Sequence, residues 1–320
     1  MTRTTPSLEA TGVDLFAAEV AEYLRRTPRQ LPSKYFYDAL GSTLFEAICR
    51  LPWYRITRAE SALLARHAHA ILAPIARPFS VAELGCGSGE KLALLLGRGA
   101  AEYRQVELID ISAEALRRAT DRLSDVPAPI RSHQVGYEEG LARLAAGRSA
   151  AVPLLLIFLG SNIGNFDPDA ARALLAGMRA ALRPGDWLLL GSDLVKGEKE
   201  LRLAYDDPLQ VTAAFNRNLL RRINDELGGT FDLDGFAHRA VWNARASRVE
   251  MHLVSRRRQT VRIAASALEI VFEPAEPIWT ESSYKYEPEA LVAEGLAAGF
   301  ASADQWIDPD ARFALTRFTV

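Results

Sequence analysis

Residues 81–91 read Val-Ala-Glu-Leu-Gly-Cys-Gly-Ser-Gly-Glu-Lys, and the rest of the chain is interpreted from this stretch. Residues 81–84 are apolar apart from one acid, and glycines alternate with other residues at 85–89. Glu90–Leu96 then has apolar residues at helical spacing. This order predicts a strand, a tight turn and a helix. Glycines permit backbone conformations that side chains forbid, and they let a ligand lie against bare peptide. The start of the helix offers N–H groups to an anion.

Glycine-rich turns are often purely structural, so the turn alone does not establish a ligand site. Residues 106–109 form a second apolar stretch, and it ends in Asp110. An acid about twenty residues beyond such a turn accepts hydrogen bonds from a ribose diol, which indicates a nucleoside cofactor. The acid Glu83 before the turn and the short tip at 87–89 fit S-adenosylmethionine (SAM) better than the Gly-x-Gly-x-x-Gly fingerprint of NAD sites.

The composition is that of a soluble globular protein. The chain has 320 residues, 49% of them hydrophobic and 24% charged, which allows one large domain or two ordinary ones. A net charge of −2 predicts no general attraction to nucleic acid. With 2 cysteines and 5 histidines, the chain offers neither a disulfide framework nor a metal set. No signal-peptide pattern or bilayer-spanning run is recognised, so we expect a cytoplasmic protein with no membrane partner. We also expect it to be a monomer.

Apolar stretches alternate with amphipathic stretches between residues 81 and 192. Such alternation predicts βαβ units and a parallel sheet that helices cover on both faces. Ligands of these sheets bind beyond the carboxyl ends of the strands. The expected strands are residues 81–84, 106–109, 130–135, 154–159 and 187–192, and the expected helices are Glu90–Leu96, 113–123, 138–145 and 168–182.

The alternation stops after Lys196, which predicts a second domain. We expect an α/β sheet domain of residues 60–195 plus 287–320, an inserted α+β domain of residues 13–59 plus 196–286, and a flexible segment at 1–12. The elements expected after residue 196 are a helix at 199–227, antiparallel strands at 241–254, 260–272 and 278–286, a helix at 288–298, and strands at 303–307 and 313–320.

Several further motifs occur in a characteristic order. They are Phe-Leu-Gly-Ser-Asn-Ile-Gly-Asn at 158–165, Leu-Leu-Leu-Gly-Ser-Asp-Leu-Val-Lys at 188–196, Ala-Tyr-Asp-Asp at 204–207 and Thr-Ala-Ala-Phe-Asn-Arg-Asn at 212–218. With the glycine turn, they resemble the SAM-dependent L-histidine Nα-methyltransferases of ergothioneine biosynthesis over nearly the whole chain. The resemblance implies a class I (Rossmann-like) methyltransferase sheet with an inserted substrate-binding domain. It also implies SAM as co-substrate, and L-histidine as the substrate that three methylations convert to hercynine.

The resemblance also implies which residues bind SAM. Lys91 is matched to a lysine for the methionyl carboxylate, and Asp110 to an acid for the ribose. The family's acid near the adenine is absent, because this chain reads Val135-Gly136-Tyr137, so we expect backbone groups and Tyr137 to hold the adenine. The predicted cofactor-binding residues are Gly85, Gly87, Ser88, Lys91, Asp110, Gly136 and Tyr137.

By the same resemblance, Tyr54, Asn165 and Tyr205 hold the amino-acid end of histidine. Glu281 and Ser283 hold the imidazole, and two residues at this spacing project from one face of a strand. On local pattern alone we would interpret Glu281 as a solvated acid and Met251 as a core methionine, and the loop at 158–166 fits a helix cap as well as it fits a substrate-facing loop. The predicted substrate-binding residues are Tyr37, Tyr54, Gly160, Asn165, Tyr205, Met251, Glu281 and Ser283.

Methyl transfer from a sulfonium needs a neutral amine in line with the S–CH3 bond, so positioning is the expected catalytic effect. We assign positioning to Asn165, Tyr205 and Tyr37 and name no strong general base. Two other functions stay open, namely an Nα-methyltransferase for another aromatic amino acid such as tryptophan, and a non-catalytic SAM- or NAD-binding module. A carboxylate with a hydroxyl suits imidazole better than indole, which offers one donor and no acceptor.

Overall fold

The computed structural model describes residues 12–97, 103–149 and 151–320. The chain divides into two compact units. Unit 1 comprises the chain up to Ile48 with Tyr205–Val241 and Glu250–Glu281, and unit 2 comprises Cys49–Ala204, Trp242–Val249 and Ser282–Val320. Of the segment expected to be flexible, residues 1–11 lie outside the described part, and Gly12 begins helix α1. The functional roles predicted for two domains remain predictions.

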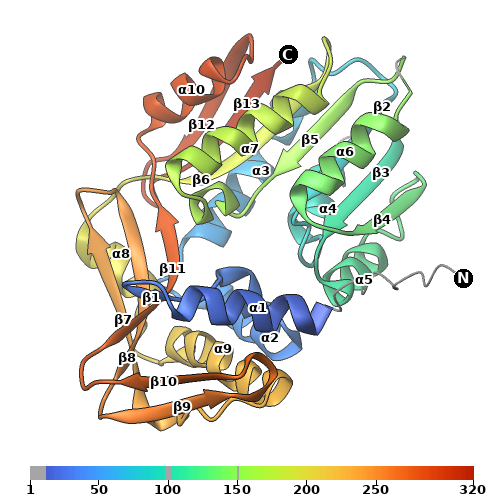
Figure 1. The fold of residues 1–320 in the computed structure, drawn as a ribbon. Coiled ribbons are helices and arrows are strands. Elements are labelled where there is room, and N and C mark those ends of the chain that lie inside the picture. Colours follow the sequence, from blue (N-terminus) through green and yellow to red (C-terminus); the bar gives the residue numbers. More distant parts are fainter. Residues whose placement is uncertain (1–11, 98–102, 150) are drawn as a thin grey trace, which may run out of the picture. The chain divides into compact units, whose positions relative to one another are not determined.

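A seven-stranded sheet forms the centre of unit 2, in the order β12-β13-β6-β5-β2-β3-β4 (Figure 1). Its first five strands in the chain run parallel, and β13 joins β6 antiparallel. From β2 the chain builds β3 and β4 on one side, and then β5 and β6 on the other. Ligands of such sheets bind where this reversal occurs, at the carboxyl ends of β2 and β5. The strands are β2 (Phe79–Leu84), β3 (Tyr103–Asp110), β4 (Ile130–Gln134), β5 (Leu154–Phe158), β6 (Trp187–Asp193), β12 (Ser302–Asp308) and β13 (Phe313–Thr319).

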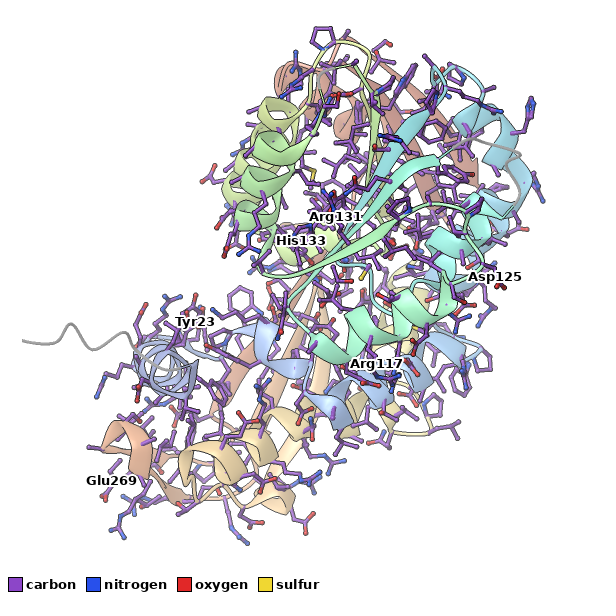
Figure 2. The ribbon with its side chains drawn as sticks, turned by 90° about the vertical axis from the view of Figure 1, so that its right-hand side faces the viewer. Tyr23, Arg117, Asp125, Arg131, His133 and Glu269 are labelled. Carbon is purple, nitrogen blue, oxygen red and sulfur yellow. The ribbon has the colours of Figure 1, made fainter. Side chains whose placement is uncertain are left out.

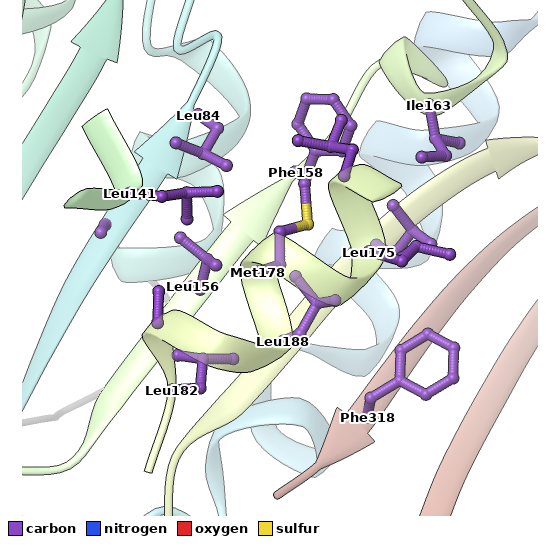
Figure 3. Close-up of a cluster of buried hydrophobic side chains, with 14 of the residues drawn as sticks. Leu84, Leu141, Leu156, Phe158, Ile163, Leu175, Met178, Leu182, Leu188 and Phe318 are labelled. Carbon is purple, nitrogen blue, oxygen red and sulfur yellow. The ribbon is translucent and has the colours of Figure 1, made fainter. Parts of the chain in front are cut away.

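Helices cover both faces of this sheet, which explains why the central strand β5 is apolar along its whole length (Figure 1). On one face, Met178 and Leu175 of α7 pack against Leu156 and Leu188 of the sheet (Figure 3). That face carries α6 (Tyr137–Gly147), α7 (Pro168–Ala181) and α10 (Pro288–Ala297), and the other carries α3 (Ile56–Leu72), α4 (Glu90–Leu96) and α5 (Ala113–Arg122).

Strand β4 is one of the two edges of the sheet, and its side chains after Ile130 are polar. Arg131 and His133 project from it (Figure 2), and His133 Nε2 lies 2.6 Å from Glu107 Oε2 on the neighbouring strand. Charged residues on an edge strand discourage pairing with other chains.

The helix expected at 199–227 is wrong as a single element. The structure has α8 (Glu198–Tyr205) and α9 (Val211–Leu227) instead. Pro208 accounts for the break, because the residue before a proline disfavours helical conformation. Asp207 then caps the second helix, since its carboxylate accepts hydrogen bonds from the first two backbone N–H groups of α9, at 3.2 and 2.8 Å.

The strands of the inserted region form two further sheets. One has the order β1-β11-β8-β7, with β1 parallel to β11, and the other is the hairpin β9–β10. Buried and half-buried residues alternate along β8, with Met251 on its buried side. The elements are α1 (Gly12–Leu24), β1 (Arg29–Gln30), α2 (Ala39–Arg50), β7 (Phe236–Asn243), β8 (Arg248–Ser255), β9 (Gln259–Ile263), β10 (Leu268–Phe272) and β11 (Pro277–Tyr284).

Candidate active site

The glycine turn of unit 2 has the backbone that its sequence predicts. Gly85, Gly87 and Gly89 have φ angles of 70°, 52° and 70°, a region that L side chains rarely adopt. A Cβ atom on Gly85 would lie 3.0 Å from the Tyr137 hydroxyl oxygen, whereas one on Gly87 would meet no atom of the described residues within 4 Å. The turn is therefore tightly packed at its start and open at its middle, where a ligand can lie against the backbone.

Asp110 ends strand β3 beside this turn. Its Oδ2 accepts a hydrogen bond from the Gly87 backbone at 3.1 Å, and its Oδ1 accepts one from the Ser112 backbone at 2.9 Å. Burial raises the pKa of Asp110, and the backbone donors of Ser112 and Gly87 oppose that rise. A carboxylate has about four acceptor positions, so capacity remains for the hydroxyls of a ribose.

Lys91 lies in the first turn of α4 and forms an ion pair with Glu60 of α3. The Glu60 carboxylate, which is fully buried, also accepts hydrogen bonds from the Gly160 backbone N–H at 2.8 and 3.0 Å. Burial lowers the pKa of Lys91, but the charge and hydrogen bond of Glu60, together with the charge of Glu83 and a smaller effect of Cys49, leave that pKa raised. The structure therefore brings Lys91 and Gly160 together through an acid that sequence analysis missed.

A signal for Glu60 was present in the sequence. Glu60 falls on the buried face of α3 with Leu64, Ala68 and Ile71, and an acid within an apolar stripe indicates a buried partner. A Cβ atom on Gly191 would lie 1.9 Å from Glu60 Oε1, so the glycine at this position of strand β6 provides the space for the carboxylate.

Glu83 is a second buried carboxylate, located in β2 just before the turn. Burial raises its pKa to about 8, and Lys91 only partly offsets this. Its Oε2 atom has no hydrogen-bond partner among the described residues. A bound ligand with a hydrogen-bond donor at this position would satisfy this buried oxygen atom.

The predicted adenine residues lie at the start of α6. Gly136 precedes the helix, and a Cβ atom there would meet nothing in the described chain within 4 Å. The Tyr137 ring packs edge-on against Phe158 at a centroid distance of 5.2 Å, which holds it beside the turn. Ser88 lies at the tip of the turn, where its carbonyl oxygen accepts a hydrogen bond from Arg122 Nε at 3.1 Å.

The loop after β5 supplies the predicted substrate residue Asn165, half-buried at the end of a 3-10 turn (Asn162–Asn165). Gly164 is necessary there, because a Cβ atom on it would lie 2.7 Å from the Tyr284 carbonyl oxygen. Ser283 is buried in β11, where its Oγ accepts a hydrogen bond from Lys285 Nζ at 2.8 Å. Tyr54 is buried in the segment that precedes α3.

The remaining predicted substrate residues belong to unit 1. The Tyr37 ring lies edge-on to Phe45 and Phe215, at centroid distances of 5.6 and 5.9 Å. Tyr205 is buried at the end of α8, and its carbonyl oxygen lies 2.8 Å from His238 Nε2. Glu281 is half-buried in β11, and Met251 is buried in β8.

The open turn, the acceptor capacity of Asp110 and the unpartnered Glu83 oxygen fit a SAM molecule. Together with a parallel sheet that carries antiparallel β13 between β6 and β12, they define a class I, Rossmann-like, SAM-dependent methyltransferase. The family model described as "Histidine-specific methyltransferase, SAM-dependent" matches residues 16–320, and the chain belongs to this family. The predicted family, fold class and co-substrate are thereby confirmed.

The chain is also similar to individual proteins. It is 42% identical over 315 residues to a histidine N-alpha-methyltransferase of Mycolicibacterium smegmatis, covering 94% of this chain and 96% of that protein. It is 40% identical over 302 residues to a histidine N-alpha-methyltransferase of Mycobacterium tuberculosis, covering 93% and 92%. A fungal relative, ergothioneine biosynthesis protein 1 of Neurospora crassa, is 29% identical over 282 residues, which is 82% of this chain and 32% of the fungal protein.

Proposed function

We propose that this protein transfers three methyl groups from SAM to the α-amine of L-histidine and so produces hercynine for ergothioneine biosynthesis. The observation that carries the proposal is the family match over residues 16–320. Two bacterial relatives of similar length bear the name histidine N-alpha-methyltransferase, and a fungal relative bears the name of ergothioneine biosynthesis.

In this proposal residues 60–195 plus 287–320 bind SAM. Asp110 accepts hydrogen bonds from the ribose hydroxyls, and Lys91 attracts the methionyl carboxylate. Tyr137 and the backbone at Gly136 contact the adenine, and the open backbone at Gly87 lets the nucleoside approach. The contacts of Asp110 and Lys91 with neighbouring groups support these roles, because both charges are held in place before any ligand binds.

Residues 13–59 plus 196–286 are proposed to form the substrate-binding domain. Tyr54, Asn165 and Tyr205 are assigned to the amino-acid end of histidine, where neutral donors suit a carboxylate. Glu281 and Ser283 are assigned to the imidazole, and strand β11 contains both residues, which supports their projection from one face. Tyr37, Gly160 and Met251 complete the proposed set.

The chemistry follows from the substrate. An α-amine has a pKa of about 8, so a minor but sufficient fraction is neutral near pH 7. The enzyme then mainly positions the amine in line with the S–CH3 bond. Each round of methylation replaces an amine hydrogen, so hydrogen bonds from the amine are lost and the nitrogen ends as a fixed cation. An enzyme that binds the carboxylate and the imidazole of histidine keeps the substrate bound through all three rounds. Aromatic faces such as those of Tyr37 and Phe215 tolerate that cation.

The first experiment is mass spectrometry of a reaction that contains SAM and an equimolar mixture of the twenty amino acids. We expect one product, histidine carrying three methyl groups. Methylated tryptophan or tyrosine would preserve the co-substrate but contradict the imidazole assignment. A reaction with no methylated amino acid would contradict the proposed function as a whole.

We further propose that the enzyme is a cytoplasmic monomer that acts on a small molecule, without nucleic acid or membrane. The net charge of −2 supports the absence of a nucleic-acid partner. None of the helices in the described chain is both long enough and apolar enough to cross a bilayer. Light scattering after size exclusion tests the monomer, since a dimer would double the mass of 35.2 kDa.

A further inference from the structure

The motif Thr-Ala-Ala-Phe-Asn-Arg-Asn at 212–218 contains two asparagines that have no role in the function proposed above. The motif lies in the first half of α9 in unit 1, and Asn216 is 0% exposed there. Asparagine is a poor helix former, and a buried amide is costly unless it forms hydrogen bonds. The role of Asn216 therefore follows from the groups that its side chain contacts.

The Asn216 amide contacts two groups of unit 1. Its Nδ2 donates to the His252 carbonyl oxygen at 3.2 Å and lies 2.9 Å from His238 Nδ1. An amide nitrogen is only a donor, so His238 Nδ1 accepts the second amide hydrogen. In this orientation the Asn216 Oδ1 has no hydrogen-bond partner among the described residues. The reverse orientation would place two oxygens in contact at His252.

The other nitrogen of the His238 ring faces the end of α8. His238 Nε2 lies 2.8 Å from the Tyr205 carbonyl oxygen, and a carbonyl oxygen only accepts, so Nε2 carries the proton. Tyr205 is the last residue of α8, where carbonyl groups have no partner within the helix. His238 therefore supplies the donor that the Tyr205 carbonyl needs, as a neutral ring in a single tautomer.

The surroundings of His238 favour this neutral form. Its side chain is 2% exposed, and burial lowers its pKa. The Tyr205 carbonyl and the carboxylates of Asp206 and Asp207 oppose that effect, with Asp206 Oδ1 at 3.9 Å from Nε2. The charge of Arg217 adds to the lowering. Protonation would also place a hydrogen on Nδ1, which now accepts from an amide.

These hydrogen bonds connect two residues of the proposed substrate-binding set. At one end is Tyr205, which is assigned to the amino-acid end of histidine. At the other end is the His252 carbonyl in β8, directly after Met251. Strand β8 is an inner strand of its sheet, and the Met251 carbonyl accepts from Thr280 Oγ1 of the neighbouring β11 at 3.0 Å. The end of α8 is thus attached to a strand that is itself fixed.

Resting on the proposed function, we propose that Asn216 and His238 are positioning residues that hold Tyr205 at a set distance from strand β8, so that its hydroxyl binds the carboxylate of histidine. Helix ends fray, and the last residue of α8 therefore needs a hydrogen bond from outside the helix to keep its side chain in one position. The amide and the imidazole have fixed sizes, which sets the distance. Both residues act through Tyr205 and not on the reacting atoms.

The first test is calorimetric binding of histidine to the enzyme saturated with S-adenosylhomocysteine. We expect His238→Phe, which keeps an aromatic ring but loses both hydrogen bonds, to weaken histidine binding about tenfold and to leave S-adenosylhomocysteine binding unchanged. His238→Gln should recover most of the loss, because its amide nitrogen donates to the Tyr205 carbonyl. Unchanged histidine binding by His238→Phe, or no recovery in His238→Gln, would overturn the proposal.

A double-mutant cycle tests the dependence on Tyr205. Tyr205→Phe removes the hydroxyl assigned to the histidine carboxylate and should itself weaken histidine binding. In that background His238→Phe should add little further loss, because the group that it positions is gone. Losses that multiply independently would contradict the proposal, and so would wild-type histidine affinity in Tyr205→Phe.

Asn216→Ala and Asn224→Ala form a matched pair in α9. Asn224 donates to the Phe231 carbonyl at 2.8 Å and accepts from the Phe231 N–H at 2.9 Å, so it also holds a backbone segment, but outside the chain of hydrogen bonds that leads to Tyr205. Both substitutions should lower the Tm, whereas only Asn216→Ala should weaken histidine binding, by several-fold. If both variants weaken histidine binding equally, the effect is a general loss of stability and the proposal fails.

A measurement on the His238 ring itself does not depend on the affinity of a variant. Nitrogen-15 NMR of the protein near pH 7 should show this ring as neutral with its proton on Nε2, its signals being assigned by their absence in His238→Gln. A proton on Nδ1, or a charged ring, would overturn the proposal. The failure of the proposed function is distinct, because it would appear as absence of methylated histidine in the mass spectrum, whereas this inference can fail with methylation intact.

Discussion

The carboxylate of Glu60 accepts the backbone N–H of Gly160 at 2.8 Å, although 100 residues separate the two in the chain. The same carboxylate forms an ion pair with Lys91, the residue assigned to the methionyl carboxylate. One buried acid of α3 therefore fixes both the start of α4 and the loop after β5. These are the two sides of the position at which ligands bind in a sheet of this topology.

Removal of Glu60 should destabilise unit 2. We expect Glu60→Ala to lower the free energy of unfolding by about 3 kcal/mol, because the Gly160 N–H and the Lys91 ammonium lose a buried partner. Glu60→Gln should cost less, since its amide oxygen still accepts from Gly160. Urea unfolding measures both values. Equal losses for the two variants would show that the Gly160 hydrogen bond contributes nothing.

Lys91→Met should weaken SAM binding about tenfold or more, because a charged hydrogen bond to the methionyl carboxylate is lost. 5′-Methylthioadenosine, which lacks the amino-acid end, provides the matched ligand and should bind the wild type and the variant equally. Calorimetry measures both ligands. A comparable loss for 5′-methylthioadenosine would place Lys91 at a different part of the cofactor.

Gly136→Asp should strengthen SAM binding several-fold by restoring an acid near the adenine, a gain of about 1 kcal/mol for one hydrogen bond. The substitution introduces no strain, since φ is −71° at this position and a Cβ atom meets nothing described within 4 Å. Aspartate is also favourable where a helix begins. Gly136→Ala is the control for the added side chain. If Gly136→Asp binds SAM no more tightly than Gly136→Ala does, the prediction is refuted.

Glu83 should make the stability of the protein without SAM depend on pH. Its folded pKa of about 8 lies above the ordinary glutamate value of about 4.5, so the folded state holds the proton more tightly than the unfolded state does. The resulting contribution to the free energy of unfolding is complete below about pH 4.5 and is lost as the pH rises through about 8. Glu83→Gln stays neutral, so its Tm relative to the wild type should increase from pH 5 to pH 8. A difference in Tm that does not change with pH would contradict the raised pKa.

Glu281→Ala should weaken histidine binding about tenfold and leave SAM binding unchanged, because the lost carboxylate is assigned to an imidazole N–H. Calorimetry with S-adenosylhomocysteine present measures the effect. Glu281→Gln, which keeps an acceptor oxygen without the charge, should lose less. Wild-type histidine affinity in Glu281→Ala would refute the assignment.

Local patterns predicted much of the fold. The five parallel strands and the helices between them begin and end within a few residues of the expected positions, because apolar periodicity and glycine turns act over short stretches of chain. The break at Pro208 is also a local signal, and the helix expected across it is wrong because a proline disfavours helical conformation in the residue before it.

The sequence by itself determined the class of sheet, the glycine turn with its acid at Asp110, and the family, since each is carried by residues close together in the chain or by motifs in order. Only the tertiary structure decided the acidic partners of Lys91 and Lys285. Glu60 reaches Gly160, and Asp193 reaches Lys285, across separations that no periodicity spans. A buried charge needs an oppositely charged partner nearby. Which residue lies near enough to be that partner depends on how α3, β6 and β11 pack and pair.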